Sequence, residues 1–312
     1  MRVQPFEPSY LPQLLELVNL HLGAAVPGWA LSGAFLAEHL ERDHTEPITD
    51  PWVEERATLC AVDGGRVLAA AHLLRYGEGQ EVGGGYRGAG EIDWFVALPG
   101  RDDAATAVLA AVRERQAGWE VRKEYGWISG LPTIPMIGVP ESWPHVATAL
   151  ERAGHRPTPK NHDREAIYGG GLDGVPAPPE EPPVPGLTVR RTLGPWGTRF
   201  SAVAGGEEVG FCEIAPELTR GGLLPALRGW ADLQEIRVHE DWRGRGIGGH
   251  LVRHAVAWLR LAGCDRIVFN VASPDEAAGA GRFYRRFGWE VIVREVGPNT
   301  TVSAGPGSEE KS

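Results

Sequence analysis

The 312-residue sequence contains few cysteines and no long apolar segment. Its three cysteines, Cys60, Cys212 and Cys264, lie far apart and show neither a CxxC motif nor a Cys/His ligand spacing. These features argue against a disulfide framework and against a zinc site, and we expect a protein of the reducing cytoplasm. No run of about 18 apolar residues is present, so the sequence predicts no transmembrane helix.

The chain also lacks an excess of positive charge. Its formal net charge is −10 at pH 7. Because an acidic chain repels nucleic acid and anionic membranes, we expect neither as a partner. With 42% hydrophobic and 23% charged residues the composition is that of a globular protein, and the length suggests two domains.

A segment rich in proline and glycine divides the chain. Residues 169–186 contain six prolines, and proline fits neither a helix interior nor a sheet interior. We interpret this segment as a semi-extended linker. The expected division is a first domain at 1–168, a second domain at 187–304 and a disordered tail at 305–312.

The two parts of the chain show the same order of predicted elements. Each has a strand, a hairpin around a Gly-rich turn, a third strand of the hairpin sheet, a long helix, another strand and a short helix. Only the first part has a helical insert, at about 10–40. This order predicts an α/β protein made of two similar copies, each with a mixed sheet flanked by helices. The expected ranges are 1–5, 57–62, 66–75, 91–98, 104–116, 126–129 and 144–153 in the first part, and 187–192, 198–203, 208–215, 232–239, 247–262, 266–272 and 276–287 in the second.

The stretch 232–249 carries the clearest chemical signal, because it runs from a strand through a glycine-rich loop into an amphipathic helix. The first N–H groups of a helix have no internal partner and carry the positive end of the helix dipole. Glycines at 244, 246, 248 and 249 let the backbone close around phosphate oxygens, and Arg243 and Arg245 add donors suited to phosphate. The sequence therefore predicts an anion-binding loop. The alternative without a ligand is a glycine-rich turn with surface arginines.

A dinucleotide site is a rival interpretation of the same loop. Gly244-x-Gly246-x-x-Gly249 satisfies the dinucleotide fingerprint, and Asp265 follows at about the 20-residue distance that the fingerprint requires. However, Asp265 precedes the next strand, whereas a ribose-binding acid belongs at the carboxyl end of that strand. A dehydrogenase is therefore the weaker hypothesis.

Two motifs resemble a known family. Arg243-x-x-Gly246-x-Gly248 after a Val-rich strand resembles the acetyl-CoA signature of the GCN5-related N-acetyltransferase (GNAT) superfamily. The later segment 283–289, FYRRFGW, resembles the tyrosine-bearing helix end of that family. The resemblance is close over the second domain and loose over the first, and the tandem arrangement is similar in architecture to mycothiol synthase. It implies tandem GNAT-like domains and an acyltransferase that uses acetyl-CoA and no metal.

The resemblance also implies roles for individual residues. Tyr284 would protonate the leaving thiolate as the general acid, and Asp232, six residues before Val238, would be the base. Strand alternation places Gln234 on the same face as Asp232 and Glu235 on the opposite face. The cofactor-binding residues would be Ile236, Arg237, Val238, Arg243, Gly244, Arg245, Gly246, Ile247, Gly248, Gly249 and Asn270.

These residues also have structural interpretations. Asp232 lies roughly 20 Å along the strand from the expected carbonyl, so it would act through water or serve only as a strand-edge carboxylate. Without a catalytic role, Tyr284 would extend an apolar helix face. Ala278 stands where the family often has an asparagine, so the chain departs from the family pattern at that cofactor contact. His250 and His254 have a metal-compatible i, i+4 spacing, but no third ligand is evident, so we interpret them as helix-surface histidines.

The first half departs from the family pattern at both decisive places. Its loop, 99–106, has one glycine and two acids, Asp102 and Asp103, which would repel a phosphate. Leu150 stands in the place of Tyr284 and cannot donate a proton. We therefore expect the first domain to be a structural or substrate-shaping copy.

The expected reaction is direct acyl transfer to a small-molecule amine, because two domains can wall a closed cleft. A non-catalytic CoA-binding module and a peptide or protein N-acetyltransferase remain the alternatives. A monomer and a homodimer are both compatible with the sequence.

Overall fold

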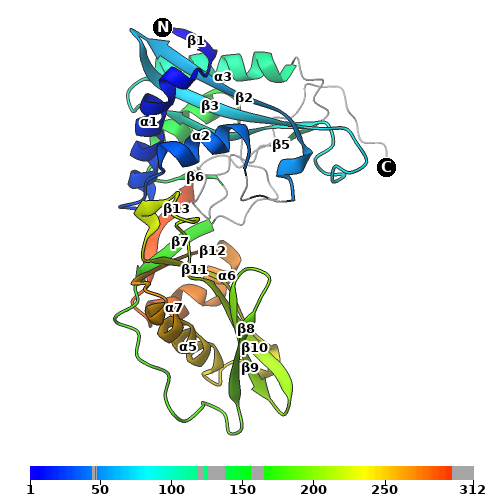
Figure 1. The fold of residues 1–312 in the computed structure, drawn as a ribbon, viewed down its shortest axis with the longest axis vertical. Helices are drawn as coiled ribbons and strands as arrows, with labels where there is room; N and C mark the ends of the chain where they lie inside the picture. The colour runs from blue at the N-terminus through cyan, green and yellow to red at the C-terminus, as the bar shows by residue number, and fades with distance from the viewer. Residues whose placement is uncertain (44–45, 47, 118–122, 126–137, 156–164, 297–312) are drawn as a thin grey trace. The chain divides into compact units, whose positions relative to one another are not determined.

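The computed structural model describes residues 1–43, 46, 48–117, 123–125, 138–155 and 165–296 (Figure 1). It divides into two compact units, one formed by Met1–Glu165 with Val293–Ser312 and the other by Ala166–Ile292. In neither unit does a described helix have the length and apolar character needed to cross a membrane. The expected tail at 305–312 lies outside the described residues.

The first unit is built on a five-stranded sheet in the order β1-β2-β3-β4-β5, in which β2 and β3 are the long strands (Figure 1). Neighbouring strands pair antiparallel, except that β4 and β5 are parallel. The predicted hairpin is confirmed as β2 and β3. The strands are β1 (Arg2–Pro5), β2 (Val53–Asp63), β3 (Arg66–Tyr76), β4 (Ala89–Ala97) and β5 (Lys123–Tyr125).

Helices pack on this sheet and bury its apolar side chains. α1 (Leu11–Ala25) contacts β3 and β4, α2 (Gly33–Glu41) contacts β2, α3 (Asp102–Ala117) contacts β1 to β4, and α4 (Pro144–Arg152) contacts α3 and β4. The predicted insert is thus confirmed as two helices. The short strand β6 (Val139–Pro140) pairs with the last residues of the chain's final strand. The strand expected at 126–129 lies outside the described residues.

The second unit has a mixed sheet in the order β13-β7-β12-β11-β10-β9-β8. Strands β8 to β11 form an antiparallel meander, and β11 pairs parallel with β12. The predicted hairpin is confirmed as β9 and β10. The strands are β7 (Glu165–Gly171), β8 (Thr188–Leu193), β9 (Thr198–Ala204), β10 (Glu207–Ala215), β11 (Trp230–Val238), β12 (Arg266–Ala272) and β13 (Glu290–Val296).

Three helices complete the second unit. α5 (Ile247–Leu261) packs on β9, β10 and β11, and buries Leu251, Ala255 and Leu259. One helix was expected at 276–287, but the structure has two, α6 (Ser273–Ala278) and α7 (Ala280–Arg285). They separate at Gly279, whose φ of 115° lies in a region that side chains with a Cβ rarely adopt. The described residues also include the 3₁₀ turns η1 (Pro8–Tyr10), η2 (Asp50–Trp52), η3 (Pro225–Leu227) and η4 (Glu240–Trp242).

The segment expected to be a linker begins inside a strand. Residues 169–171 belong to β7, which lies between β12 and β13 in the sheet of the second unit. The next residues are also anchored, because Leu172 and Val175 are buried and Arg260 of α5 donates hydrogen bonds to both of their carbonyl oxygens, at 2.7 Å to Val175. The boundary of the second unit therefore lies at Ala166, before the proline-rich segment rather than after it.

Candidate active site

Strands β11 and β12 form the frame of the site. Their parallel pairing covers Trp230–Asp232 and ends at Asp232 opposite Val268. Beyond this point a pocket of about 610 Å³ opens between residues of β11, the end of β12 and helices α6 and α7. We call it the wedge pocket. It is lined by Leu233, Gln234, Glu235, Ile236, Val238, Arg243, Gly248, Asn270, Val271, Ala272, Asp275, Ala278, Gly279, Ala280, Phe283 and Tyr284.

A β-bulge in β11 sets which side chains reach the wedge pocket. Leu233 pairs with Ile214 and Glu235 pairs with Glu213, so Gln234 is an extra residue in β11. A bulge interrupts the alternation of side chains along a strand. Consequently Gln234 and Glu235 both line the pocket, and the expectation that Glu235 lies on the face away from it is wrong.

Asp232 lies at the closed end of the wedge and is not among the residues that line it. It is connected to the pocket by Gln234, whose Nε2 donates a hydrogen bond of 2.7 Å to Oδ2 of Asp232. Burial raises the pKa of the Asp232 carboxyl to about 7. A carboxyl with this pKa exchanges its proton near neutral pH, which suits a general base.

Tyr284 of α7 lines the wedge pocket on the side opposite β11. Its side chain is 7% exposed, and its ring packs 4.4 Å from that of Phe269 and 6.4 Å from that of Trp289. Burial, assisted by the nearby Cys212 thiol, raises the pKa of the Tyr284 phenol above its ordinary value of 10. The phenol therefore holds its proton at neutral pH and can donate it.

The glycine-rich loop before α5 forms a second pocket, of about 510 Å³, which we call the loop pocket. Gly246 is the N-cap of α5 with φ of 82°, and no side chain caps the helix there. The amide groups of the first turn are therefore left for a ligand, as a phosphate site requires. The pocket is lined by Pro176, Val238, Trp242, Arg243, Gly244, Gly246, Ile247, Gly248, Gly249, Arg253, Phe283, Arg286 and Phe287.

The two pockets adjoin and differ in charge. They share Val238, Arg243, Gly248 and Phe283. All charged side chains that line the loop pocket are arginines, whereas the wedge pocket has the carboxylates of Glu235 and Asp275. Arg243 lies where they meet, and its Nε donates a hydrogen bond of 3.1 Å to the carbonyl oxygen of Val238.

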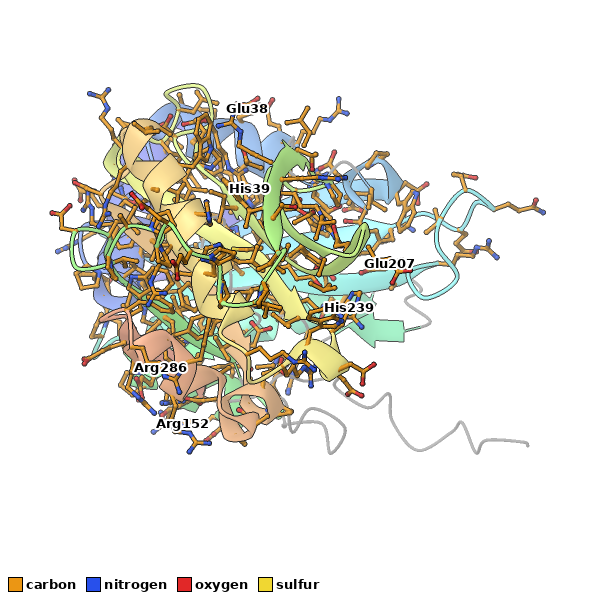
Figure 2. The ribbon with its side chains drawn as sticks, turned by 90° about the horizontal axis from the view of Figure 1, so that it is seen from below. Glu38, His39, Arg152, Glu207, His239 and Arg286 are labelled. Atoms are coloured by element: carbon orange, nitrogen blue, oxygen red, sulfur yellow. The ribbon has the colours of Figure 1, made fainter. Side chains whose placement is uncertain are left out.

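Most of the residues expected at the site line one of the pockets. Arg237 and Arg245 line neither; the guanidinium of Arg245 lies instead 5.1 Å from the ring centre of Trp242. The sequence interpretation missed Arg253 and Arg286. Arg253 follows Gly249 by four residues, so the helical spacing contained the signal for it. Arg286 leaves the end of α7 (Figure 2), and no local pattern indicates its position. The expected residues that line a pocket are Ile236, Val238, Arg243, Gly244, Gly246, Ile247, Gly248, Gly249, Asn270 and Tyr284.

The two histidines of α5 contact each other. His250 Nε2 lies 3.2 Å from His254 Nε2. His250 is 5% exposed, so the interpretation of both as surface side chains is wrong for this one. Across the described part of the chain, no group of three His, Cys, Asp or Glu residues is arranged to hold a metal ion.

Comparison with known proteins defines the class of enzyme. Residues 195–291 match the model of the acetyltransferase (GNAT) domain. This part of the chain is therefore a GNAT acetyltransferase domain. No curated protein sequence matches the chain.

Solved structures extend this likeness in fold to the whole chain. A GCN5-related N-acetyltransferase from Sphaerobacter thermophilus has a TM-score of 0.59 at 16% identity, with 96% of this chain and 98% of that chain covered. A tandem GNAT protein from the clavulanic acid biosynthesis pathway has a TM-score of 0.57 at 16% identity, with 94% and 96% covered. A fungal glucosamine N-acetyltransferase region has a TM-score of 0.59 at 14% identity, with 94% and 37% covered. The chain thus has the tandem GNAT fold.

Proposed function

We propose that the second unit transfers an acetyl group from acetyl-CoA to a small-molecule amine by direct transfer. The observation that carries this proposal is the pair of adjoining pockets with opposite charge. The loop pocket offers uncapped amides and arginines to the diphosphate of the cofactor. The wedge pocket offers Glu235 and Asp275 to a cationic amine, since carboxylates attract a cation. The thioester would lie where the pockets meet.

The residues around the junction supply the proton transfers. The bound ammonium first releases one proton to solvent; the neutral nitrogen then bonds to the acetyl carbon, the carbon–sulfur bond breaks, and the nitrogen loses its second proton. Asp232, ionised above about pH 7, accepts that proton through water, while Gln234 donates a hydrogen bond to its carboxylate. Tyr284 gives its phenolic proton to the departing sulfur and recovers one from solvent. Holding both reactants in adjoining pockets supplies much of the rate gain.

The test is release of free thiol from acetyl-CoA in the presence of a panel of amines. The panel would contain aminoglycoside-like polyamines, amino-acid amines and peptide N-termini. We expect turnover with one or more small cationic amines. We also expect Tyr284→Phe to lower kcat by about 100-fold, the scale of a lost general acid, with little change in the KM for acetyl-CoA.

Two results would contradict the proposal in different ways. Thiol release with peptides alone would make the protein a peptide N-acetyltransferase. Binding of acetyl-CoA in calorimetry without thiol release from any amine would make it a CoA-binding module. If Tyr284→Phe kept full turnover, Tyr284 would not be the acid.

A further inference from the structure

The loop pocket holds more positive charge than a diphosphate requires. In a chain of net charge −10, the pocket is lined by three arginines, Arg243, Arg253 and Arg286, and by no carboxylate. The uncapped amides before α5, together with Arg243 at the junction, suffice for a diphosphate. Arg253 and Arg286 remain to be explained.

Arg253 is positioned to face the loop pocket. It lies four residues after Gly249, so both are on one face of α5. Its Nε is buried and has no hydrogen-bond partner within the described residues. An unsatisfied guanidinium nitrogen is unfavourable in the protein alone, and a ligand anion would remove that penalty.

Arg286 approaches the same pocket from another helix. It follows the last residue of α7 and is exposed (Figure 2). No ion pair joins Arg253 or Arg286 to a carboxylate of the described residues, whereas Arg199 and Arg266 of the same unit are both paired. Two guanidinium groups from separate helices therefore converge on one cavity with their donors available.

A phosphate monoester is the ligand group that fits two converging arginines. It is close to doubly charged at neutral pH and has three acceptor oxygens, which match the planar fork of a guanidinium. Coenzyme A carries one such group, the 3′-phosphate of its ribose, in addition to the diphosphate. The apolar walls formed by Trp242, Pro176 and Phe287 lie in the same pocket and can cover the rest of the nucleotide.

We propose that Arg253 and Arg286 bind the 3′-phosphate and make the enzyme select CoA over the same molecule without that phosphate. This inference rests on the proposed use of acetyl-CoA. It assigns to the two arginines a specificity role and no part in the acyl transfer.

Calorimetry with CoA and 3′-dephospho-CoA tests this assignment. We expect the unaltered protein to bind CoA at least about tenfold more tightly, the scale of a hydrogen bond between charged groups. Arg253→Gln and Arg286→Gln should each lower the affinity for CoA and leave that for 3′-dephospho-CoA unchanged, and the double variant should bind both ligands equally. Arg285→Gln is the matched control, because Arg285 is exposed on the same helix and lines neither pocket, so it should keep the full preference.

The outcomes separate this inference from the proposed function. Equal affinity of the unaltered protein for both ligands would overturn the inference and leave the use of CoA in place. A parallel loss of both affinities in the arginine variants would also overturn it. Binding of neither ligand by the unaltered protein would remove the proposed function as well.

Discussion

The two copies share the pairing of their strands and differ in the side chains and helices around those strands. In both copies the third strand of the hairpin sheet has a β-bulge, with Asp93 as the extra residue in β4 and Gln234 in β11. In both, the residue two positions before the bulge residue pairs in parallel with the next strand, Glu91 with Tyr125 and Asp232 with Val268. The bulge is therefore a property of the fold, and the difference between the copies lies in the residues around it.

The helix after the bulged strand, α3 in the first copy and α5 in the second, differs most clearly between the copies at its N-terminus. In the second copy α5 begins without a side-chain cap. In the first copy Arg101 donates to both carboxylate oxygens of Asp103, at 2.9 and 2.8 Å, and Arg152 donates to Asp102. The start of α3 is thus occupied by the protein's own carboxylates. We therefore expect an anion to bind at the start of α5 and not at the start of α3.

The surroundings of the two bulge residues differ as well. In the first copy Asp93 Oδ2 lies 3.1 Å from Nε2 of His39, which comes from the helix α2 that the second copy lacks (Figure 2). In the second copy the equivalent Gln234 is exposed and lines a pocket. The helical insert thus supplies the partner of Asp93, whereas Gln234 bonds Asp232 of its own strand and lines the wedge pocket.

The largest effect on cofactor affinity is expected from a bulky side chain in the glycine-rich loop of the second copy. Gly248 lines both pockets, and an added Cβ would lie 3.5 Å from the ring of Phe283 without backbone strain. Gly248→Leu should lower acetyl-CoA affinity by about a thousandfold, or about 4 kcal/mol, because the larger side chain displaces the diphosphate from the loop amides. Calorimetry measures this loss, and circular dichroism checks that the variant folds.

Asp103→Leu is the matched change in the first copy, at the second residue of α3. It removes the carboxylate that Arg101 binds, and acetyl-CoA affinity should stay within twofold of the unaltered value, about 0.4 kcal/mol. Equal losses in the two variants would mean that both copies bind the cofactor, and the contrast between them would fail.

A smaller effect is expected from the two equivalent carboxyls. Because ionised Asp232 accepts the proton, kcat/KM should rise with pH up to about 7 and then level off. Asp232→Asn should lower kcat by about 100-fold and abolish this rise. Glu91→Gln, the equivalent change in the first copy, should leave the pH profile unaltered. A rise near pH 7 that persists in Asp232→Asn would assign the base to another group, and Glu235 in the wedge pocket would be the next to test.

Local sequence predicted the elements whose cause is local. The glycine-rich turns indicated both hairpins, and the glycines before Ile247 indicated the uncapped start of α5. The bulge at Gln234 was not predicted, because it depends on the pairing of β11 with β10 rather than on β11 alone. For this reason the face of Glu235 was predicted wrongly.

The glycines after Tyr168 show the same limit. They resemble the beginning of a linker, yet they lie in β7. A Cβ on Gly169 would come within 2.6 Å of the carbonyl oxygen of Ile267, and one on Gly170 within 2.9 Å of the Trp289 ring. Glycine is required there because of close neighbours that are distant in sequence, and no local pattern distinguishes that reason from flexibility.

The smallest effect on activity is expected from Glu91, whose burial affects the stability of the first copy. Burial, and then the charge of Asp93, raises the pKa of Glu91 to about 8, while the hydroxyl of Tyr76 donates a hydrogen bond of 2.8 Å to it. Between the ordinary pKa of 4.5 and about 8 the folded protein holds a proton that the unfolded chain loses, so stability falls as pH rises through this window. Glu91→Gln keeps an acceptor for Tyr76 and cannot ionise. This linkage amounts to about 3–4 kcal/mol between pH 5 and pH 8, so the melting temperature of the variant relative to the unaltered protein should rise by roughly 10 °C over that range. For Asp232→Asn, the melting temperature relative to the unaltered protein should rise with pH and level off near pH 7. If the melting-temperature difference stays constant with pH in both variants, burial does not keep either carboxyl protonated.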